Sequence, residues 1–98
     1  MEVRFQDARL DRLETDPTYD AGLPPAVVTA FRRRMQLIRN APDERDFYQL
    51  KSLHFEKLKG KRTKQHSMRL NDQWRLIIEL QGAASDKTVA VISIEDYH

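Results

Sequence analysis

The last third of the sequence limits the possible folds most strongly, because it consists of strand-forming residues. Apolar and polar residues alternate over residues 67–70 and again over residues 74–80, which is the period of a β-strand. Between these segments stand Asn71 and Asp72, two residues that tolerate the backbone angles of a tight turn. Residues 87–95 are rich in β-branched side chains. The pattern therefore predicts a β-hairpin, a looser connection and one further strand.

Helices are expected before these strands. After a short strand at residues 3–5, residues 7–14 fit a short helix or turn. The clearest helix covers residues 24–40, and it is expected to end there because Pro42 disfavours helical angles at the residue before it. Its buried stripe consists of apolar residues at three- and four-residue spacing: Val28, Phe31, Met35 and Ile38. A short further helix is expected over residues 43–50, with the aspartate at its start as the cap.

This order of elements indicates an α+β fold, in which N-terminal helices pack on a largely antiparallel β-sheet. The last two strands carry apolar residues on both faces, so helices are expected to cover at least one side of the sheet. No repeat or long linker divides the 98 residues, and a chain of this length can bury one hydrophobic core. We therefore expect a single domain over residues 1–98.

The same periodicity places individual side chains. Trp74 continues the apolar face of the strand that follows it and is expected in the core, whereas Arg75 points to the opposite face. His66 is expected at the surface beside a lysine-rich loop. The three arginines at residues 32–34 interrupt the apolar stripe of the long helix, and we interpret them as a solvated helix face, with contact to a partner or RNA as the alternative.

Composition excludes several classes of protein. The chain has no cysteine, which rules out disulfides and thiolate zinc sites and is compatible with a reducing compartment. Its first residues lack the apolar segment of a signal peptide, and no apolar run approaches the roughly 18 residues that span a bilayer. A cytoplasmic location is therefore the default expectation, with no membrane partner.

Basic residues are concentrated in the middle of the chain. Residues 51–75 contain eight lysines and arginines and two acidic residues, a net charge of +6, whereas the whole chain carries only +2. A local excess of positive charge of this size favours binding of a polyanion such as RNA, because contacts with phosphates release counterions. A solvated lysine-rich loop is the alternative. The RNA-binding candidates in this segment are Lys57, Lys59, Lys61, Arg62 and Lys64.

The reactive residues favour metal-independent cleavage of RNA. The three histidines are scattered and form no ligand cluster, and neither a glycine-rich phosphate loop nor a serine nucleophile motif is present. We expect no metal and no cofactor. Histidine, tyrosine and arginine are sufficient for attack by the ribose 2′-hydroxyl, which needs a base, an acid for the leaving oxygen and fixed positive charge on the phosphorane.

Three short motifs resemble those of HigB-type toxins of the RelE superfamily. They are Leu-Lys-Gly at residues 58–60, the hairpin sequence at residues 67–76 and Asp-Tyr-His at residues 96–98. In that family, a Leu-Lys-Gly turn leads to a Ser-x-Arg-x-Asn-x-x-Trp-Arg hairpin, and the chain ends at or near Asp-Tyr-His. The three motifs occur here in the family's order over roughly the last 45 residues.

The resemblance implies a RelE-like toxin domain that cleaves messenger RNA in the A site of the 30S ribosomal subunit. There the toxin would also contact ribosomal RNA. It also implies a helix-turn-helix antitoxin of the HigA type, through which the toxin–antitoxin complex binds operator DNA. The residues at the family's active-site positions are Arg69, Arg75, Tyr97 and His98, with Asn71 and Asp96 as supporting members and Lys59 facing RNA.

The general base stays open at this stage. His54 is a further catalytic candidate, although it precedes the Leu-Lys-Gly turn at a spacing two residues longer than in some family members. Asn71 has an alternative explanation as a turn residue. For the protein as a whole, the first alternative is a RelE-like module without catalysis that binds RNA or an antitoxin. A DNA-binding repressor is less well supported, because the long helix lacks a partner at helix-turn-helix spacing.

Overall fold

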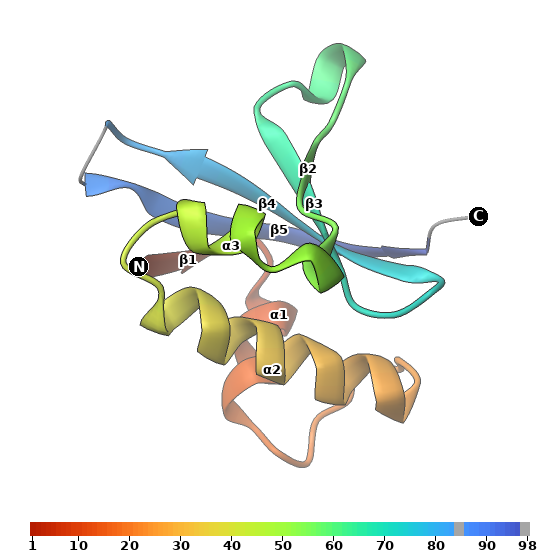
Figure 1. Cartoon of the computed structure of the whole chain (residues 1–98). Helices are drawn as coiled ribbons and strands as arrows, with labels where there is room; N and C mark the ends of the chain where they lie inside the picture. The colour runs from red at the N-terminus through yellow and green to blue at the C-terminus, as the bar shows by residue number, and fades with distance from the viewer. Residues whose placement is uncertain (84–85, 97–98) are drawn as a thin grey trace.

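A five-stranded sheet forms the centre of the computed structural model, which describes residues 1–83 and 86–96 (Figure 1). The strand order is β1-β5-β4-β3-β2. The strands are β1 (Glu2–Phe5), β2 (Glu56–Lys57), β3 (Gln65–Arg69), β4 (Trp74–Gln81) and β5 (Thr88–Asp96). All neighbouring strands are antiparallel except β1, which lies parallel to β5. The predicted hairpin and last strand are confirmed within two residues at each end.

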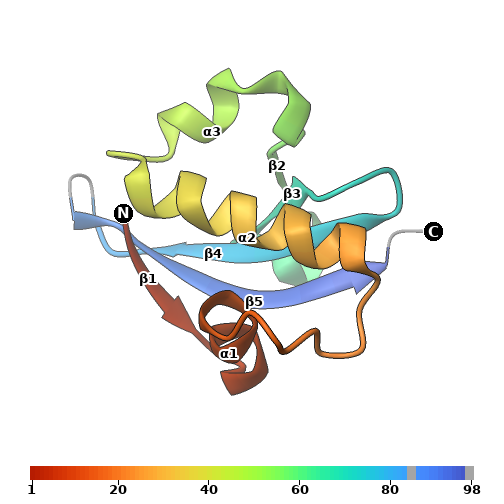
Figure 2. The same cartoon turned by 90° about the horizontal axis from the view of Figure 1, so that it is seen from below.

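The helices gather on one face of the sheet, as the two perpendicular views show (Figure 2). They are α1 (Ala8–Thr15), α2 (Pro25–Asn40) and α3 (Arg45–Gln49), and the 3₁₀ turns η1 (Lys51–Leu53) and η2 (Gly60–Arg62) lie before and after β2. The predicted stripe of α2 is buried and packs with apolar residues of the strands, among them Met68, Leu76 and Val91. The α+β fold with helices on a largely antiparallel sheet is therefore confirmed.

Aspartate side chains accept backbone N–H groups near the start of two helices, although the residue that caps α3 is Glu44 and not the predicted Asp43. Asp7 Oδ1 accepts the backbone N–H of Arg9 at 2.9 Å at the start of α1. Asp43 Oδ1 likewise accepts the N–H of Arg45 at 2.9 Å, although α3 is shorter than the predicted segment 43–50. The same arginine side chain, together with that backbone bond, lowers the pKa of Asp43 to about 2. The two 3₁₀ turns and β2 were not predicted.

The prediction of a solvated arginine face on α2 is wrong for two of the three arginines. Arg32 donates to the carbonyl oxygens of Leu13, Asp16 and Tyr19, each at 3.1 Å, and so ties the α1–α2 connection to α2. Arg34 donates from Nε to the carbonyl oxygen of Arg69 at 3.0 Å. Both side chains are half-buried. Their partners lie 13 to 35 residues away in sequence, so no local pattern reveals them.

The prediction of a surface position for His66 is also wrong. Its imidazole is 9% exposed and stacks on Phe55, with ring centroids 4.8 Å apart and an interplanar angle of 5°. Burial lowers the pKa of His66, and the nearby charge of Lys57 lowers it further. His66 Nδ1 is buried without a hydrogen-bond partner in the described part of the chain.

No helix among the described residues has the length and apolar character needed to cross a membrane.

Candidate nucleic-acid site

Two predicted site residues lie directly opposite each other in the hairpin. Arg69 of β3 is the register partner of Arg75 of β4, and Arg75 is in turn the partner of Glu95 on β5. Because side chains alternate along a strand, these three residues share the face of the sheet that points away from Trp74 and α2. This confirms the sequence prediction that Arg75 and Trp74 point to opposite faces.

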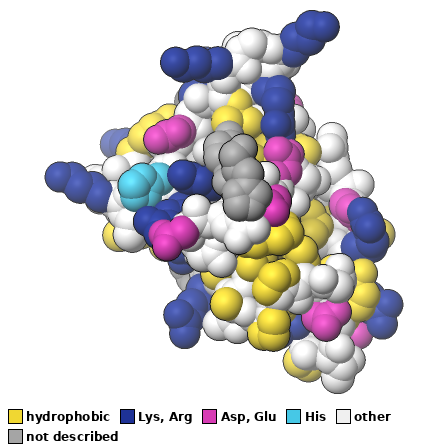
Figure 3. Space-filling model, turned by 90° about the vertical axis from the view of Figure 1, so that its right-hand side faces the viewer, with side chains coloured by type: hydrophobic (Ala, Val, Ile, Leu, Met, Phe, Trp, Pro, Cys, Tyr) yellow, Lys and Arg dark blue, Asp and Glu magenta, His cyan; other side chains and the backbone are white. Residues whose placement is uncertain are grey.

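His54 lies beside this row of charges. Arg75 Nη1 is 3.4 Å from the carbonyl oxygen of His54, which brings the segment after η1 next to β4. His54 caps η1 with φ 46° and ψ 51°, so a non-glycine residue occupies the left-handed region. Its side chain is exposed, whereas Arg69 and Arg75 are half-buried. Three of the five predicted catalytic residues are therefore brought together. Figure 3 shows a histidine with Lys and Arg side chains beside it on this side of the molecule.

The hairpin turn is fixed by its own polar side chains. Asn71 Oδ1 accepts the backbone N–H groups of Gln73 and Trp74 at 2.9 and 2.8 Å, which closes an Asx-type turn. The Asp72 carboxylate forms an ion pair with Arg69. Gln73 Nε2 donates to Asp96 Oδ2 at 3.0 Å. Asn71 therefore has a structural role in the turn, and the predicted residue Asp96 is tied to the same turn.

The basic segment between β2 and β3 combines exposed lysines with one anchored arginine. We call residues 57–64 the basic loop. Its four lysines are exposed: Lys57, Lys59, Lys61 and Lys64. Arg62 instead donates two hydrogen bonds of 3.0 and 2.7 Å to the Glu95 carboxylate, and it donates a third to Gln65 Oε1 at 2.9 Å. The Arg62 guanidinium holds the pKa of Glu95 below its usual range. Arg62 thus anchors the basic loop to β5 next to Arg75.

The remaining predicted catalytic residues, Tyr97 and His98, lie outside the described residues. Among residues 1–83 and 86–96, no group of three or more His, Cys, Asp or Glu side chains is arranged to hold a metal ion. Sequence reasoning missed two residues that contact the site, Arg34 and Glu95. Alternation along β5 could have placed Glu95 on the face of Arg75, but its register could not be read from the sequence.

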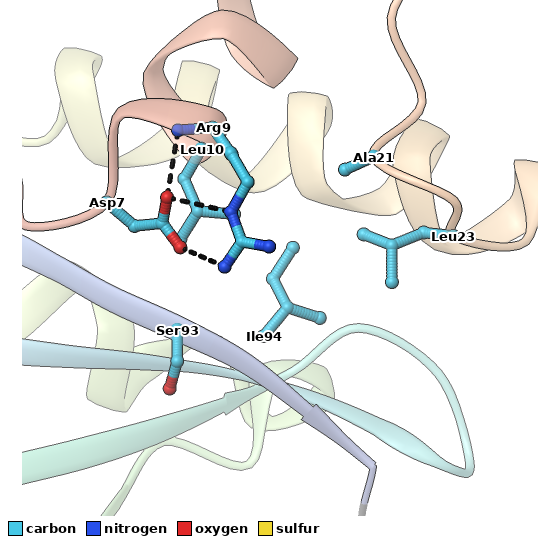
Figure 4. Close-up of a pocket in the computed structure, with 7 residues that line it drawn as sticks. All are labelled: Asp7, Arg9, Leu10, Ala21, Leu23, Ser93 and Ile94. Atoms are coloured by element: carbon cyan, nitrogen blue, oxygen red, sulfur yellow. Dashed lines mark hydrogen bonds and ion pairs between the residues drawn. The ribbon is translucent and has the colours of Figure 1, made fainter.

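A separate pocket of about 210 Å³ lies between α1, the α1–α2 connection and β5 (Figure 4). Arg9 Nη2 and Asp7 Oδ2 are 2.8 Å apart at one side of it, while Leu23 and Ile94 form part of the other. None of the predicted site residues lines this pocket. This pocket is therefore a separate region from the candidate site described above.

Comparison with known proteins bears on the family and the fold. Residues 3–98 match the family described as the RelE-like toxin of the type II toxin–antitoxin system HigB. A YoeB/ParE toxin from Agrobacterium tumefaciens is similar in structure, with a TM-score of 0.65 and 20% identity over 100% of both chains. YafQ from E. coli strain BL21(DE3) gives a TM-score of 0.60 and 14% identity over 97% of this chain and 91% of that one.

The sequence has no significant match among curated proteins. The two structural likenesses support the fold, because sequence identity to both is low. The family match covers all but the first two residues. Type II toxins are paired with an antitoxin, so the same match implies such a partner. The chain thus belongs to the HigB-like family of RelE-like toxins from type II toxin–antitoxin systems.

Proposed function

We propose that this protein is a ribosome-dependent messenger RNA endoribonuclease that cleaves in the A site of the 30S subunit. The observation that carries the proposal is the pairing of Arg69 with Arg75 on neighbouring strands, beside His54. Like charges directly opposite each other destabilise an antiparallel pair. A pair of this kind is useful when a phosphate binds between the two guanidinium groups, each of which can donate to two oxygens.

The reaction is attack of the ribose 2′-hydroxyl on the adjacent phosphorus. The 2′-oxygen forms a bond to phosphorus, the bond to the 5′-oxygen breaks, and a proton passes to that leaving oxygen. Arg69 and Arg75 stabilise the charge that accumulates on the phosphorane. His54, Tyr97 and His98 supply the base and the acid, and the exposed lysines of the basic loop bind flanking phosphates and ribosomal RNA.

The proposal extends to the partners. The toxin is neutralised by a helix-turn-helix antitoxin of the HigA type, and the complex binds operator DNA through the antitoxin. Membership in a type II toxin family supports this assignment. We further propose that residues 1–98 act as one RelE-like toxin domain, and that it acts in the cytoplasm, where translating ribosomes are found.

Cleavage on programmed ribosomes tests the proposal. Purified protein is mixed with ribosomes that hold a defined mRNA, and cut sites are mapped by primer extension; the same mRNA without ribosomes is the control. We expect cuts in the A-site codon with ribosomes and almost none without them. Efficient digestion of naked RNA would contradict ribosome dependence. Ribosome binding without any cleavage would instead identify an inactive RNA-binding module.

A further inference from the structure

Arg34 reaches from α2 to the end of the strand that carries Arg69. Arg34 Nε donates to the carbonyl oxygen of Arg69 at 3.0 Å, a contact between residues 35 positions apart. Pairing of β2 with β3 ends at Ser67, so no strand lies beside Arg69 on that edge. Leu70 N–H donates to Trp74 O, which turns the backbone of Leu70 toward β4 and the preceding carbonyl toward the open edge. Arg34 therefore supplies the donor that a neighbouring strand would provide.

The contact places a third positive charge close to the site. Arg34 is half-buried, and no carboxylate within residues 1–83 and 86–96 forms an ion pair with it. Burial lowers the pKa of Arg34, and the charges of Arg33 and Arg69 lower it further. A half-buried guanidinium beside other cations costs stability. Its place in the fold therefore calls for a reason other than stability, and the hydrogen bond to the Arg69 carbonyl offers one.

We propose that Arg34 is a positioning residue for the RNA cleavage assigned above, and the inference rests on that function. By holding the Arg69 carbonyl, Arg34 fixes the end of β3, so that the Arg69 side chain stays opposite Arg75 and both bind the same phosphate. Without this tether, the turn that follows Arg69 gains freedom and the two guanidinium groups lose their alignment. A misplacement of about 1 Å at a catalytic group can reduce a rate about a hundredfold.

Three substitutions separate the hydrogen bond from the charge, because their side chains overlay the arginine atom by atom. Arg34→Gln places an amide N–H where Nε stands and removes the charge. Arg34→Met places a methyl group there and removes both. Arg34→Lys keeps a charge but moves the donor one atom further out. Arg33→Met is the matched control, since Arg33 is the exposed neighbour on the same helix.

The single-turnover rate of mRNA cleavage on saturating programmed ribosomes is the first measurement. We expect Arg34→Met to lower this rate constant about ten- to a hundredfold, with little change in the ribosome concentration that gives half-maximal rate. Arg34→Gln should restore most of the rate, and Arg33→Met should match the wild type. Restoration by Arg34→Lys and not by Arg34→Gln would overturn the proposal in favour of a purely electrostatic role.

A double-mutant cycle tests whether Arg34 acts through Arg69. In an Arg69→Ala background, Arg34→Met should produce no further loss of rate, because the side chain that it positions is gone. A full additional loss in that background would overturn the proposal. This cycle distinguishes positioning from general destabilisation, which would add to the effect of any other substitution.

Hydrogen exchange separates failure of this inference from failure of the proposed function. Amides of residues 69–75 should exchange faster in Arg34→Met than in the wild type, and at the wild-type rate in Arg34→Gln. If the wild type does not cut mRNA but exchange follows this order, the tether is real and the endonuclease assignment is wrong. If exchange in the hairpin is the same in all variants, the tether is overturned whatever the activity.

Discussion

Arg69 and Arg75 face each other across the hairpin of β3 and β4, while Glu95 completes the row on the other side of Arg75. Two like charges in register reduce the stability of an antiparallel pair by up to about 1 kcal/mol relative to neutral residues. Asp72 and Glu95 offset part of this repulsion, and we propose that the remaining positive charge serves anion binding. Substitution of Arg69 or Arg75 is therefore expected to reduce activity far more than stability.

Arg75→Ala should abolish cleavage without unfolding the protein. Removal of one donor to a transition-state oxyanion typically costs about 2.7–4 kcal/mol of stabilisation, which corresponds to a rate loss of about two to three orders of magnitude. The melting temperature should stay close to that of the wild type, because loss of the like-charge register with Arg69 offsets loss of the interactions with His54 and Glu95. Ribosome-dependent cleavage and thermal unfolding are the two measurements.

Trp74→Ala is the matched control for Arg75→Ala. Trp74 is the neighbouring residue on β4, but its side chain packs against the core on the other face of the sheet. Its truncation should lower stability by about 3–5 kcal/mol or somewhat less, since the ring is only partly buried. Full cleavage activity of Arg75→Ala, or a loss of stability comparable with that of Trp74→Ala, would refute the role of Arg75.

The ion pair of Arg62 with Glu95 should act as an anchor for the basic loop and not as an RNA contact. Arg62→Ala and Glu95→Ala should then have the same effect, a small loss of stability of about 1 kcal/mol or less, because both side chains are partly exposed. Both should weaken ribosome binding through a mobile loop. If only Arg62→Ala weakens binding, the guanidinium contacts RNA directly.

Acid should release this anchor. The Arg62 guanidinium lowers the pKa of Glu95 from its ordinary value of 4.5, so the folded state favours the ionised carboxylate. The stabilisation is complete above pH 4.5 and is lost as the pH falls through the lowered folded-state pKa. Urea unfolding between pH 7 and pH 3 should show that the wild type loses free energy of unfolding as the pH falls. This loss should be smaller in Glu95→Gln.

The exposed lysines of the basic loop should contribute uniformly to ribosome binding. Lys59→Ala and Lys61→Ala should each weaken binding and reduce the slope of log K against log salt by about 1, as expected for the loss of one phosphate contact. The maximal cleavage rate should stay the same. Arg33→Ala, a substitution at an exposed position on α2, is the control. An unchanged salt slope for both lysine variants would support the simple solvated loop instead.

His66 should make stability depend on pH near neutrality. The folded state holds a neutral imidazole because burial lowers its pKa, and the charges of Lys57 and Lys87 act in the same direction while Glu44 opposes them. Its contribution is complete above the unfolded-state pKa of 6.5 and is lost as the pH falls toward the lowered folded-state pKa. Stability should therefore decline below pH 6.5.

His66→Phe should remove this decline, since a phenyl ring can keep the stacking on Phe55 and does not ionise. Urea unfolding of both proteins at pH 7.5 and pH 5.0 measures the difference. His54→Asn replaces an exposed histidine and is the control. It should leave the decline in stability below pH 6.5 in place. Equal pH dependence in His66→Phe and the wild type would show that another group is responsible.

The sequence was sufficient for the features that depend on neighbouring residues. The hairpin could be predicted because alternation and Asn71 specify both the strands and the turn between them, and the turn is built as expected. The stripe of α2 could be predicted because it repeats along a single helix. Arg75 was placed correctly for the same reason, since its direction is set by Trp74 beside it.

Features that depend on distant contacts could not be predicted. His66 was misplaced because its stacking partner Phe55 lies on a segment that carries no local strand or helix signal. Arg32 and Arg34 resemble solvated residues in the sequence, but their carbonyl partners are brought to them by the fold. The parallel pairing of β1 with β5 likewise joins residues that are more than 80 positions apart.

The backbone of His54 provides the last test, because it separates a structural reason for this residue from a catalytic one. With φ 46° and ψ 51°, His54 occupies a region that glycine and asparagine tolerate better than other residues. His54→Gly and His54→Asn should therefore be at least as stable as the wild type, as measured by urea unfolding. That result would show that stability does not require a histidine at this position.

If His54 is the base or the acid, both variants should lose about two to four orders of magnitude in cleavage rate despite their stability, the usual contribution of a general acid–base group. The limb of the pH–rate profile that reports this acid–base group should disappear with the side chain. His54→Ala is the control, because it removes the imidazole but keeps the backbone strain. If all three variants cut mRNA at the wild-type rate, His54 only shapes the segment beside Arg75. The proton transfers then belong to Tyr97 and His98, and Tyr97→Phe and His98→Gln should each show the loss instead.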